Sequence, residues 1–490
     1  MPAASARAWT LLLGSSALYF FSINEADNDL WGHVLFGRDI LAAGAVPRVD
    51  MYSYTATGYP WFDHEWLTQV AMAAAYARAG SPGLLLLKLA LAAATCALLF
   101  AMVRRRTAMP EIRGGLGMLT VAVLARGFAI RPQVFTYFCV ALTLWLIDGY
   151  QRGRRRALWV FPPLFVVWAN AHGGFVLGLA ILGLFVAAEC WRTHRLAAPP
   201  LLAWLASAAA TNLTPYGLTL LGYIWGELSR PHPITEWQPV AAGDVSQFVF
   251  FAMAGLFVAT LPFFREWRTN GWQPVLAVIT GALALRSQRH TPVFALCAVT
   301  PFAAQLDGAA RWLRQRSTFT LSAAAQGAVA VGLVSVAVLQ VALTALRWQH
   351  DGLEIVFDPA EYPVAAVQAL HRAGAHTNLA VPLDWGEYVL WHLAPNVKVS
   401  LDGRFATVFP DNVVADNFAF FSGAAGGRRL IEQYPTDAAL VPAGSAASIL
   451  RDGKWERVYA DDVAEIYARN DRAAAMRLTS EPASIAGVFP

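Results

Sequence analysis

The segment Glu25-Ala-Asp-Asn-Asp-Leu-Trp-Gly-His33 follows directly on the first apolar run of the chain, and the rest of the sequence is interpreted around it. It places three carboxylates and one imidazole at the point where that run ends. Ionisable groups are costly near a bilayer, and those found there usually face protein and handle a polar substrate. The segment therefore predicts an acidic rim at one surface of a membrane.

The composition indicates a membrane protein. Of the 490 residues, 57% are hydrophobic and 14% are charged, whereas soluble domains average about 25% charged residues. The net charge of +4 comes from short basic clusters between apolar runs, a pattern typical of membrane topology signals and not of nucleic-acid binding. The predicted fold class is an α-helical polytopic membrane protein of about 11 transmembrane helices, with a C-terminal external α/β domain.

Eleven apolar segments are predicted to span the membrane. They are residues 8–24, 83–103, 114–128, 131–150, 157–170, 175–192, 199–215, 247–264, 272–287, 291–306 and 320–346. Several are shorter than the ~20 residues that cross a hydrocarbon core of about 30 Å, so their ends are defined only to within several residues. The first segment lacks a signal-peptide cleavage site and is expected to be retained as a helix.

The arginines predict the orientation of these spans. Alternate connections are basic, at 104–113, 152–156, 192–195, 265–268 and 311–316, and Arg7 lies on the same side. The short connections on the other side hold only Arg126, Arg131, Arg230, Arg286 and Arg289. The positive-inside rule therefore places the N-terminus in the cytoplasm, and an odd number of spans places the C-terminus outside. The cysteines Cys96, Cys139, Cys190 and Cys297 all fall inside predicted spans, as small hydrophobic residues.

Two external regions remain. Residues 1–348 are assigned to the transmembrane domain, including a long first external loop at 25–80, and residues 349–490 to the external α/β domain. In the loop, residues 29–43 and 61–79 predict two amphipathic interfacial helices, anchored by Trp31, Trp61 and Trp66. In the α/β domain, strands are predicted at 378–383, 397–401, 438–441 and 463–467, helices at 361–373 and 428–434, and turns at 384–388 and 402–404.

The external rim carries the residues most suited to chemistry. They are the acids Glu25, Asp27, Asp29, Asp63 and Glu65, the histidines His33, His64, His172 and His290, and the arginines Arg126, Arg131, Arg286 and Arg289. The arginines oppose the orientation bias, and a guanidinium fork matches phosphate oxygens. The acids could activate a hydroxyl acceptor or hold a metal, and the arginines could hold a lipid-linked phosphate. The alternative is that acids and arginines form salt bridges that fix the helix bundle.

Local structure also explains some of these residues. Asp27 or Asn28 could cap the helix that follows, and the acids of Asp63-His64-Glu65 would favour the N-terminus of the second helix. The glycines after His172 suit a tight turn. The sequence contains no P-loop, no G-x-G-x-x-G, no G-x-S-x-G and no cysteine–histidine zinc spacing, which argues against a nucleotide-driven machine or a serine hydrolase.

Several local patterns carry a family resemblance. They are Asp27-Asn-Asp-Leu-Trp-Gly-His33 with Gly37-Arg38, Pro47…Asp50…Tyr52-Ser53-Tyr54, Trp61…His64-Glu65-Trp66-Leu67, Trp168-Ala-Asn170-Ala-His172-Gly-Gly174, Asn212…Pro215-Tyr-Gly217 and Arg286…Arg289. Together with an acidic first loop, many spans and an external α/β domain, the chain resembles the GT-C class of integral-membrane glycosyltransferases. That class includes protein mannosyltransferases, aminoarabinose transferases and oligosaccharyltransferases. The W-W-D-type signature of oligosaccharyltransferases is absent.

The resemblance implies an inverting sugar transfer on the external (periplasmic) face of a bacterial inner membrane. The donor would be a sugar on a polyprenyl phosphate such as undecaprenyl phosphate, and the acceptor an unidentified glycan, lipid or protein. Asp27 or Asp29 would be the catalytic base, and His33, Asp63, His64 and Glu65 would orient the base or the acceptor. Arg126, Arg131, His172, Arg286, Arg289 and His290 would bind the donor phosphate. The resemblance leaves open whether a divalent cation, Mg or Mn, is needed.

Two other functions remain open from the sequence. A transporter or flippase of a lipid-linked or anionic solute would favour ionisable residues near the membrane midplane and internal repeats. Here the ionisable residues cluster at one rim, and no repeat is seen. A non-catalytic scaffold would explain the external domain but not the rim of acids and arginines.

Overall fold

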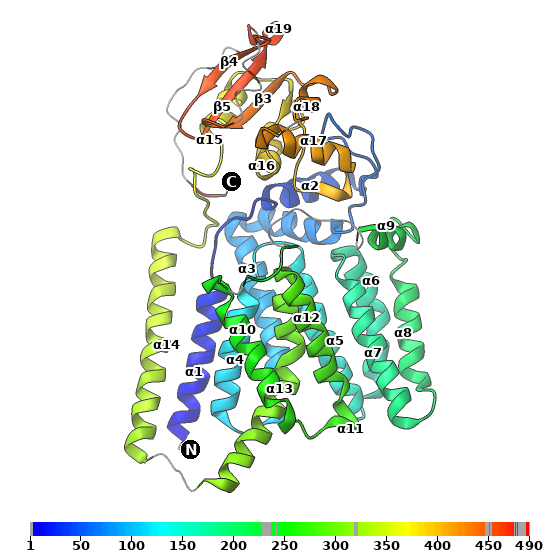
Figure 1. The fold of residues 1–490 in the computed structure, drawn as a ribbon, viewed down its shortest axis with the longest axis vertical. Coiled ribbons are helices and arrows are strands. Elements are labelled where there is room, and N and C mark those ends of the chain that lie inside the picture. Colours follow the sequence, from blue (N-terminus) through cyan, green and yellow to red (C-terminus); the bar gives the residue numbers. More distant parts are fainter. Residues whose placement is uncertain are drawn as a thin grey trace. The chain divides into compact units, whose positions relative to one another are not determined.

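The chain divides into two compact units. The computed structural model describes residues 3–227, 237–241, 243–317, 322–424, 426–445, 450, 453–474, 476, 478 and 487–489 (Figure 1). The helical unit comprises residues 1–24 and 84–353, and the mixed unit comprises residues 25–83 and 354–490. The sequence assigned the first external loop to the transmembrane domain, whereas the structure groups this loop with the C-terminal domain.

Each of the eleven predicted apolar segments contains a helix. These are α1 (Ala3–Phe21), the second part of α3 (Trp66–Arg106), α4 (Pro110–Ala125), α5 (Gln133–Gln151), α6 (Phe161–Ala171), α7 (Phe175–Thr193), α8 (Ala198–Ala210), α10 (Phe248–Thr260), α12 (Trp272–Arg286), α13 (Thr291–Arg316) and α14 (Ala323–Asp351). Among the described residues, five helices are long and apolar enough to cross a membrane: Trp66–Arg106, Gln133–Gln151, Phe175–Thr193, Gln288–Arg316 and Ala323–Asp351. The fold class of a polytopic α-helical membrane protein is confirmed.

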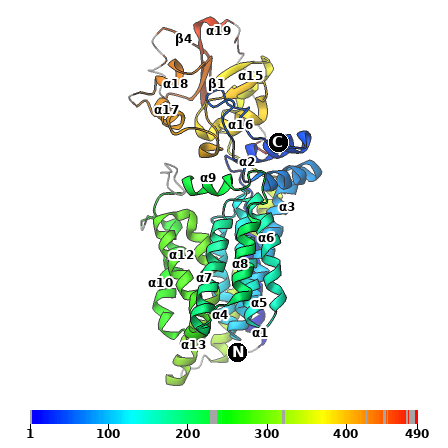
Figure 2. The ribbon, with the colours of Figure 1, turned by 90° about the vertical axis from the view of Figure 1, so that its right-hand side faces the viewer.

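The helices of the helical unit pack side by side, as both views show (Figures 1 and 2). Helix α1 packs against α14 and α4, and α13 packs against α4 and α12. Glycines on α4 allow close approach, since a Cβ added to Gly114 would lie 2.5 Å from the Trp9 ring and one added to Gly117 would lie 2.8 Å from Leu13. Small residues at such crossings let the helices approach closely, so that van der Waals packing holds them together where lipid provides no hydrophobic driving force.

A break in α3 separates the two units. Ala79 and Gly80 have non-helical backbone angles, and Gly80 has a φ of 61°, a conformation that favours glycine. Pro82 follows, and a Cβ on Gly83 would lie 2.3 Å from the carbonyl oxygen of Ala75. The glycines and the proline therefore end the first part of α3 just before the residue at which the helical unit resumes.

The mixed unit is built on a five-stranded sheet in the order β2-β1-β3-β5-β4. The strands are β1 (Thr377–Ala380), β2 (Val397–Val399), β3 (Ala438–Pro442), β4 (Trp455–Ala460) and β5 (Ala464–Arg469). β1 runs parallel to β2 and β3, and β5 runs antiparallel to β3 and β4. Its longer helices are α2 (Leu30–Ala43), α15 (Val364–Arg372), α16 (Leu383–Leu393) and α17 (Asp411–Ser422), and the short α18 spans Arg429–Glu432.

The first loop extends this sheet. Ser53 forms a parallel bridge with Val399 at the free edge of β2, where Tyr54 N–H donates to the Val399 carbonyl at 3.1 Å and Val399 N–H donates to the Tyr52 carbonyl at 3.2 Å. Glu25 bridges Val356 in the same way. Backbone pairing of this kind leaves fewer open edges and joins the loop to the C-terminal residues as one folded body.

Two sequence predictions about tryptophan are corrected. Trp31 is 0% exposed and Trp61 is 2% exposed, so neither indole is available as an interfacial anchor. Trp31 packs against the rings of Tyr362 and Tyr388, with centroid distances of 4.8 and 5.3 Å. The predicted helices themselves are present as α2 and the first part of α3. The apolar face of α2 covers α16 of the C-terminal domain, which explains its burial.

The turn predicted at 384–388 is also wrong. These residues form the first part of α16, which begins after Pro382. Gly386 fits there because a Cβ at that position would lie 2.3 Å from the Leu401 carbonyl oxygen. The glycine therefore marks a close helix–loop contact within a helix, and it does not end one.

Candidate functional site

Asp29 stands directly before α2 and is its N-terminal flanking residue, but its side chain does not cap the helix. The carboxylate of Asp27 accepts the backbone N–H of Asp29 at 3.1 Å. Asn28 Oδ1 accepts the hydroxyl of Tyr362 at 2.5 Å. Asp27 and Asn28 thus organise the turn before α2, and Asp29 is the residue at which that turn meets the helix.

Glu387 on α16 shares the surroundings of Asp29. Its Oε2 accepts the backbone N–H of Gly32 at 3.0 Å, and the residue is 3% exposed. A Cβ on Gly403 would lie 2.4 Å from Asp29 Oδ1 and 2.7 Å from Glu387 Oε1. The two carboxyl groups therefore border the same small space, which only glycine at position 403 leaves open.

Burial raises the pKa of Glu387 well above its usual value, and the charges of Asp29 and Asp402 raise it further. The guanidinium of Arg404 and the hydrogen bond from Gly32 oppose this shift without cancelling it. Two neighbouring carboxyl groups in a buried site do not ionise together easily. Burial and the neighbouring carboxylates therefore favour the protonated form of Glu387, which can donate a hydrogen bond in the direction of Asp29.

Arg404 forms a buried ion cluster with Asp402 and Asp50 next to Gly403. Its Nε and Nη2 donate to the two oxygens of Asp402 at 2.8 and 2.7 Å, and its Nη1 donates to Asp50 Oδ1 at 2.6 Å. The guanidinium also lies over the rings of Tyr52 and Trp61, 5.0 and 4.8 Å from their centroids. Since Asp50 belongs to the first loop, one buried ion cluster ties the loop to the C-terminal residues.

The sequence missed Glu387 and Arg404 as site residues. Both lie in segments that local patterns predicted to be turns, and the 402–404 turn is indeed present. Their partners are far away in the chain, so spacing alone could not identify them.

Asp63, His64 and Glu65 lie together before the first part of α3. Burial, and next the charge of Glu65, raise the pKa of Asp63 to about 8. Gln69 Nε2 donates to Asp63 Oδ1 at 2.9 Å. His64 Nδ1 contacts the Phe62 carbonyl at 3.2 Å, and its Nε2 lies 3.8 Å from Glu65 Oε1. Asp63 is thus a neutral acid near pH 7 and is hydrogen-bonded by Gln69. The fourth predicted residue of this group, His33, is buried on α2.

In the helical unit, Arg289 and His290 both contact the ring of Trp237. Both lie on the short helix η5 (Gln288–His290). Arg289 lies 5.1 Å from the Trp237 ring centroid, and the His290 ring lies 6.4 Å from it, edge to face. Gln288 N–H donates to the Gln238 carbonyl at 3.0 Å, which holds the tryptophan segment against η5. Arg286 is exposed at the end of α12.

His172 is held by structure at the end of α6. Its Nδ1 accepts the Gly174 N–H at 3.0 Å and lies 2.9 Å from the Thr136 hydroxyl. Thr136 Oγ1 in turn accepts the Trp168 indole N–H at 2.8 Å. This chain of hydrogen bonds fixes the imidazole ring and gives His172 a structural role in the turn. Its binding of the donor phosphate stays a prediction.

The remaining predicted residues are placed as follows. Arg126 and Arg131 flank the turn between α4 and α5, and Arg230 lies outside the described residues. The predicted acids belong to the mixed unit and the predicted arginines to the helical unit. Whether acids and arginines form one site stays a prediction. Within the described ranges, no group of three His, Cys, Asp or Glu side chains is arranged to hold a metal ion.

Family models and curated protein sequences give no match to this chain. Solved structures do. The apo oligosaccharyltransferase of Archaeoglobus fulgidus is similar with a TM-score of 0.57 and 9% identity, over 89% of this chain and 69% of that protein. ArnT of Cupriavidus metallidurans is 13% identical in both of its structures. The apo state has a TM-score of 0.55, over 98% of this chain and 100% of that one.

The second ArnT structure, with undecaprenyl phosphate bound, has a TM-score of 0.52 over 94% of this chain and 98% of that one. At these identities the likeness shows the fold and no more. The prediction of a GT-C fold is confirmed, because two glycosyltransferases of that class share it over nearly the whole chain.

Proposed function

We propose that this chain is a membrane glycosyltransferase that moves a sugar from a polyprenyl-phosphate-linked donor to an acceptor hydroxyl on the external face of a bacterial inner membrane. The observation that carries the proposal is the shared fold, since one of the two similar enzymes was crystallised with undecaprenyl phosphate. The acidic first loop adds support, because it places Asp29 beside a buried proton-bearing carboxyl group.

The proposed reaction needs one base and a stabilised leaving group. Asp29 takes the proton of the acceptor hydroxyl, the acceptor oxygen forms a bond to the anomeric carbon, and the bond from that carbon to the phosphate oxygen breaks. The sugar is transferred with inversion, and polyprenyl phosphate leaves with the electron pair. Glu387 orients Asp29 through its proton, and the predicted arginines neutralise the phosphate. His290 can bind the phosphate as a hydrogen-bond donor, because a neutral imidazole ring keeps one N–H. Arg289 suits this role because Trp237 holds its guanidinium in place.

The test uses the purified full chain in lipid nanodiscs with a panel of undecaprenyl-phosphate-linked sugars. The expected result is release of undecaprenyl phosphate together with transfer of label to an acceptor extracted from the same kind of membrane. Parallel reactions with a chelator and with added Mg²⁺ or Mn²⁺ test cation dependence. Movement of the intact donor across vesicle membranes without sugar release would overturn the proposal and favour the transporter alternative.

A further inference from the structure

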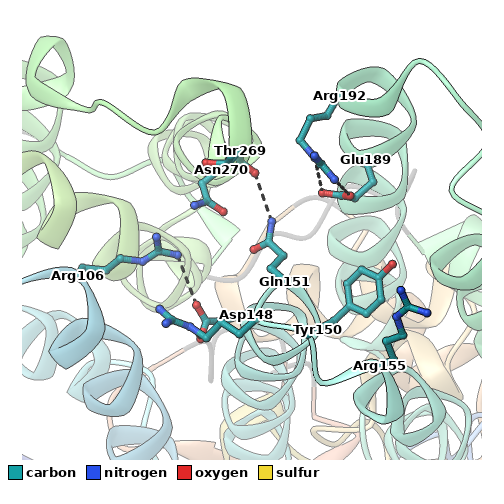
Figure 3. A pocket seen from close by; sticks show the side chains of 11 residues that line it. Arg106, Asp148, Tyr150, Gln151, Arg155, Glu189, Arg192, Thr269 and Asn270 are labelled. Carbon is teal, nitrogen blue, oxygen red and sulfur yellow. Dashed lines mark hydrogen bonds and ion pairs between the residues drawn. The ribbon is translucent and has the colours of Figure 1, made fainter.

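A polar cavity lies among the ends of several helices in the helical unit (Figure 3). Its volume is about 440 Å³. The walls come from the last residues of α3, α5 and α7, from the 152–155 turn and from α11 (Trp267–Asn270). This is the end of the unit at which the basic connections meet, and none of the candidate site residues described above lines the cavity.

The lining has an excess of positive charge. Four arginines face two carboxylates: Arg106, Arg152, Arg155 and Arg192 against Asp148 and Glu189. Most are paired, since Arg192 makes two hydrogen bonds to Glu189, at 3.2 and 2.7 Å, and Arg152 bonds Asp148 at 3.0 Å. Arg155 is exposed and, among the described residues, forms no ion pair. One full guanidinium therefore remains available to an anion at the wall formed with Tyr150.

Two buried polar atoms of the lining point to a ligand. The side chain of Arg106 is 8% exposed and pairs with Asp148 and Glu266. Its Nε nevertheless has no hydrogen-bond partner within the described part of the chain, and the same holds for Oδ1 of Asn270. Buried groups of this kind are normally satisfied. Both residues line the cavity, so these two polar atoms lie directly behind its wall.

Membrane orientation alone does not account for this arrangement. The positive-inside bias needs arginines in short connections, but it does not require them to surround a hollow. Taking guanidinium groups out of water costs free energy unless a partner compensates. The cavity volume falls in the range typical of small-ligand sites, roughly 300–1,000 Å³.

We propose that this cavity binds the phosphate of an anionic phospholipid headgroup from the adjacent leaflet. Guanidinium forks bind phosphate oxygens bidentately, and basic pockets between the ends of transmembrane helices suit anionic headgroups. A lipid is favoured over soluble phosphate because the cavity lies where α5 and α7, two of the membrane-crossing helices, end. This site is independent of the proposed sugar transfer.

The test compares two single-charge variants of one turn. Arg155→Gln removes the available guanidinium of the lining, and Arg156→Gln removes an exposed neighbour that does not line the cavity. Both remove one charge from the same connection, so they affect orientation equally. Bound lipid is counted by native mass spectrometry on the full chain with phosphatidylglycerol, with phosphatidylcholine, and with inorganic phosphate or glycerol 3-phosphate.

The expected result is preferential retention of phosphatidylglycerol. Arg155→Gln should weaken it about tenfold or more, because a charged hydrogen bond to the headgroup phosphate is lost. Arg156→Gln should leave it unchanged, because Arg156 does not line the cavity. The melting temperatures of both variants should match the wild type. Equal losses in the two variants would show surface attraction only and overturn the proposal. Equal retention of both phospholipids would overturn it as well. Binding of the soluble phosphates as tight as that of phosphatidylglycerol would overturn the lipid as the source.

Discussion

Asp29 and Glu387 lie side by side at Gly403, although one precedes the first helix of the mixed unit and the other belongs to α16 of the C-terminal domain. The backbone of Gly32, on the first turn of α2, donates to Glu387 and fixes the pair. The C-terminal domain therefore contributes to the electrostatic surroundings of Asp29 in the first loop.

The role of Asp29 as base can be separated from that of Asp27. Asp29→Asn should lower the transfer rate by about 10²–10⁴-fold, the usual contribution of a general base. Asp27→Asn should lower it far less, because the amide oxygen can still accept the Asp29 N–H that Asp27 binds. Turnover with a pure lipid-linked donor measures both. Near-wild-type turnover in Asp29→Asn would remove Asp29 as the base.

Glu387 should act in its neutral form. Glu387→Gln should keep most activity at pH 7, because the amide oxygen accepts from Gly32 and the amide nitrogen donates toward Asp29. Since the pKa of Glu387 is raised, the wild type should lose rate at alkaline pH as Glu387 ionises, and the Gln variant should lack that loss. The pH profile of transfer is the measurement. A Gln variant as inactive as Asp29→Asn would contradict a neutral Glu387.

The buried ion cluster should matter for stability. Arg404→Ala leaves Asp50 and Asp402 buried without their cation, and breaking such a cluster typically costs about 3–5 kcal/mol. Arg38→Ala is the control, because the Arg38–Asp39 pair is 56% and 41% exposed and a surface pair contributes about 1 kcal/mol or less. Tryptophan fluorescence during thermal unfolding compares the two. Similar losses would mean that the cluster is not what holds the loop.

The raised pKa of Asp63 predicts a pH-dependent stability. The folded state keeps a proton up to about pH 8, whereas the unfolded chain releases it near pH 3.9. This contribution to stability is complete below about pH 4 and is lost as pH rises through about 8, at ~1.4 kcal/mol per pH unit. Asp63→Asn lacks this loss, so its advantage in melting temperature should grow from pH 5 to pH 8. Asp462→Asn, at an exposed carboxylate, should show no such trend.

Arg289 should depend on its guanidinium shape. Arg289→Lys keeps the charge but loses the planar fork over Trp237, so donor affinity should fall by up to about tenfold while the melting temperature changes little. Arg268→Lys, at an exposed position on α11, is the control. Donor binding and thermal unfolding are measured on the same samples. Unchanged affinity in Arg289→Ala, together with a large loss of stability, would assign Arg289 a structural role.

The sequence by itself determined the membrane class and the helices. Hydropathy is a local property, so each apolar run from 8–24 to 320–346 could be recognised without knowledge of its neighbours, and each contains a helix. The acidic segment at Asp27 and Asp29 was found for the same reason, because charges beside an apolar run stand out.

Only the tertiary structure decided which residues surround those acids. The 384–388 segment has turn-like composition, yet its backbone is helical, and Gly386 lets this helix approach the Leu401 carbonyl. The sequence around Arg404 predicts only a turn, yet Arg404 pairs with Asp50, which lies in the first loop. Buried charges are stabilised by partners that folding brings together from distant parts of the chain. The spacing of residues along the sequence therefore does not reveal which partners they have.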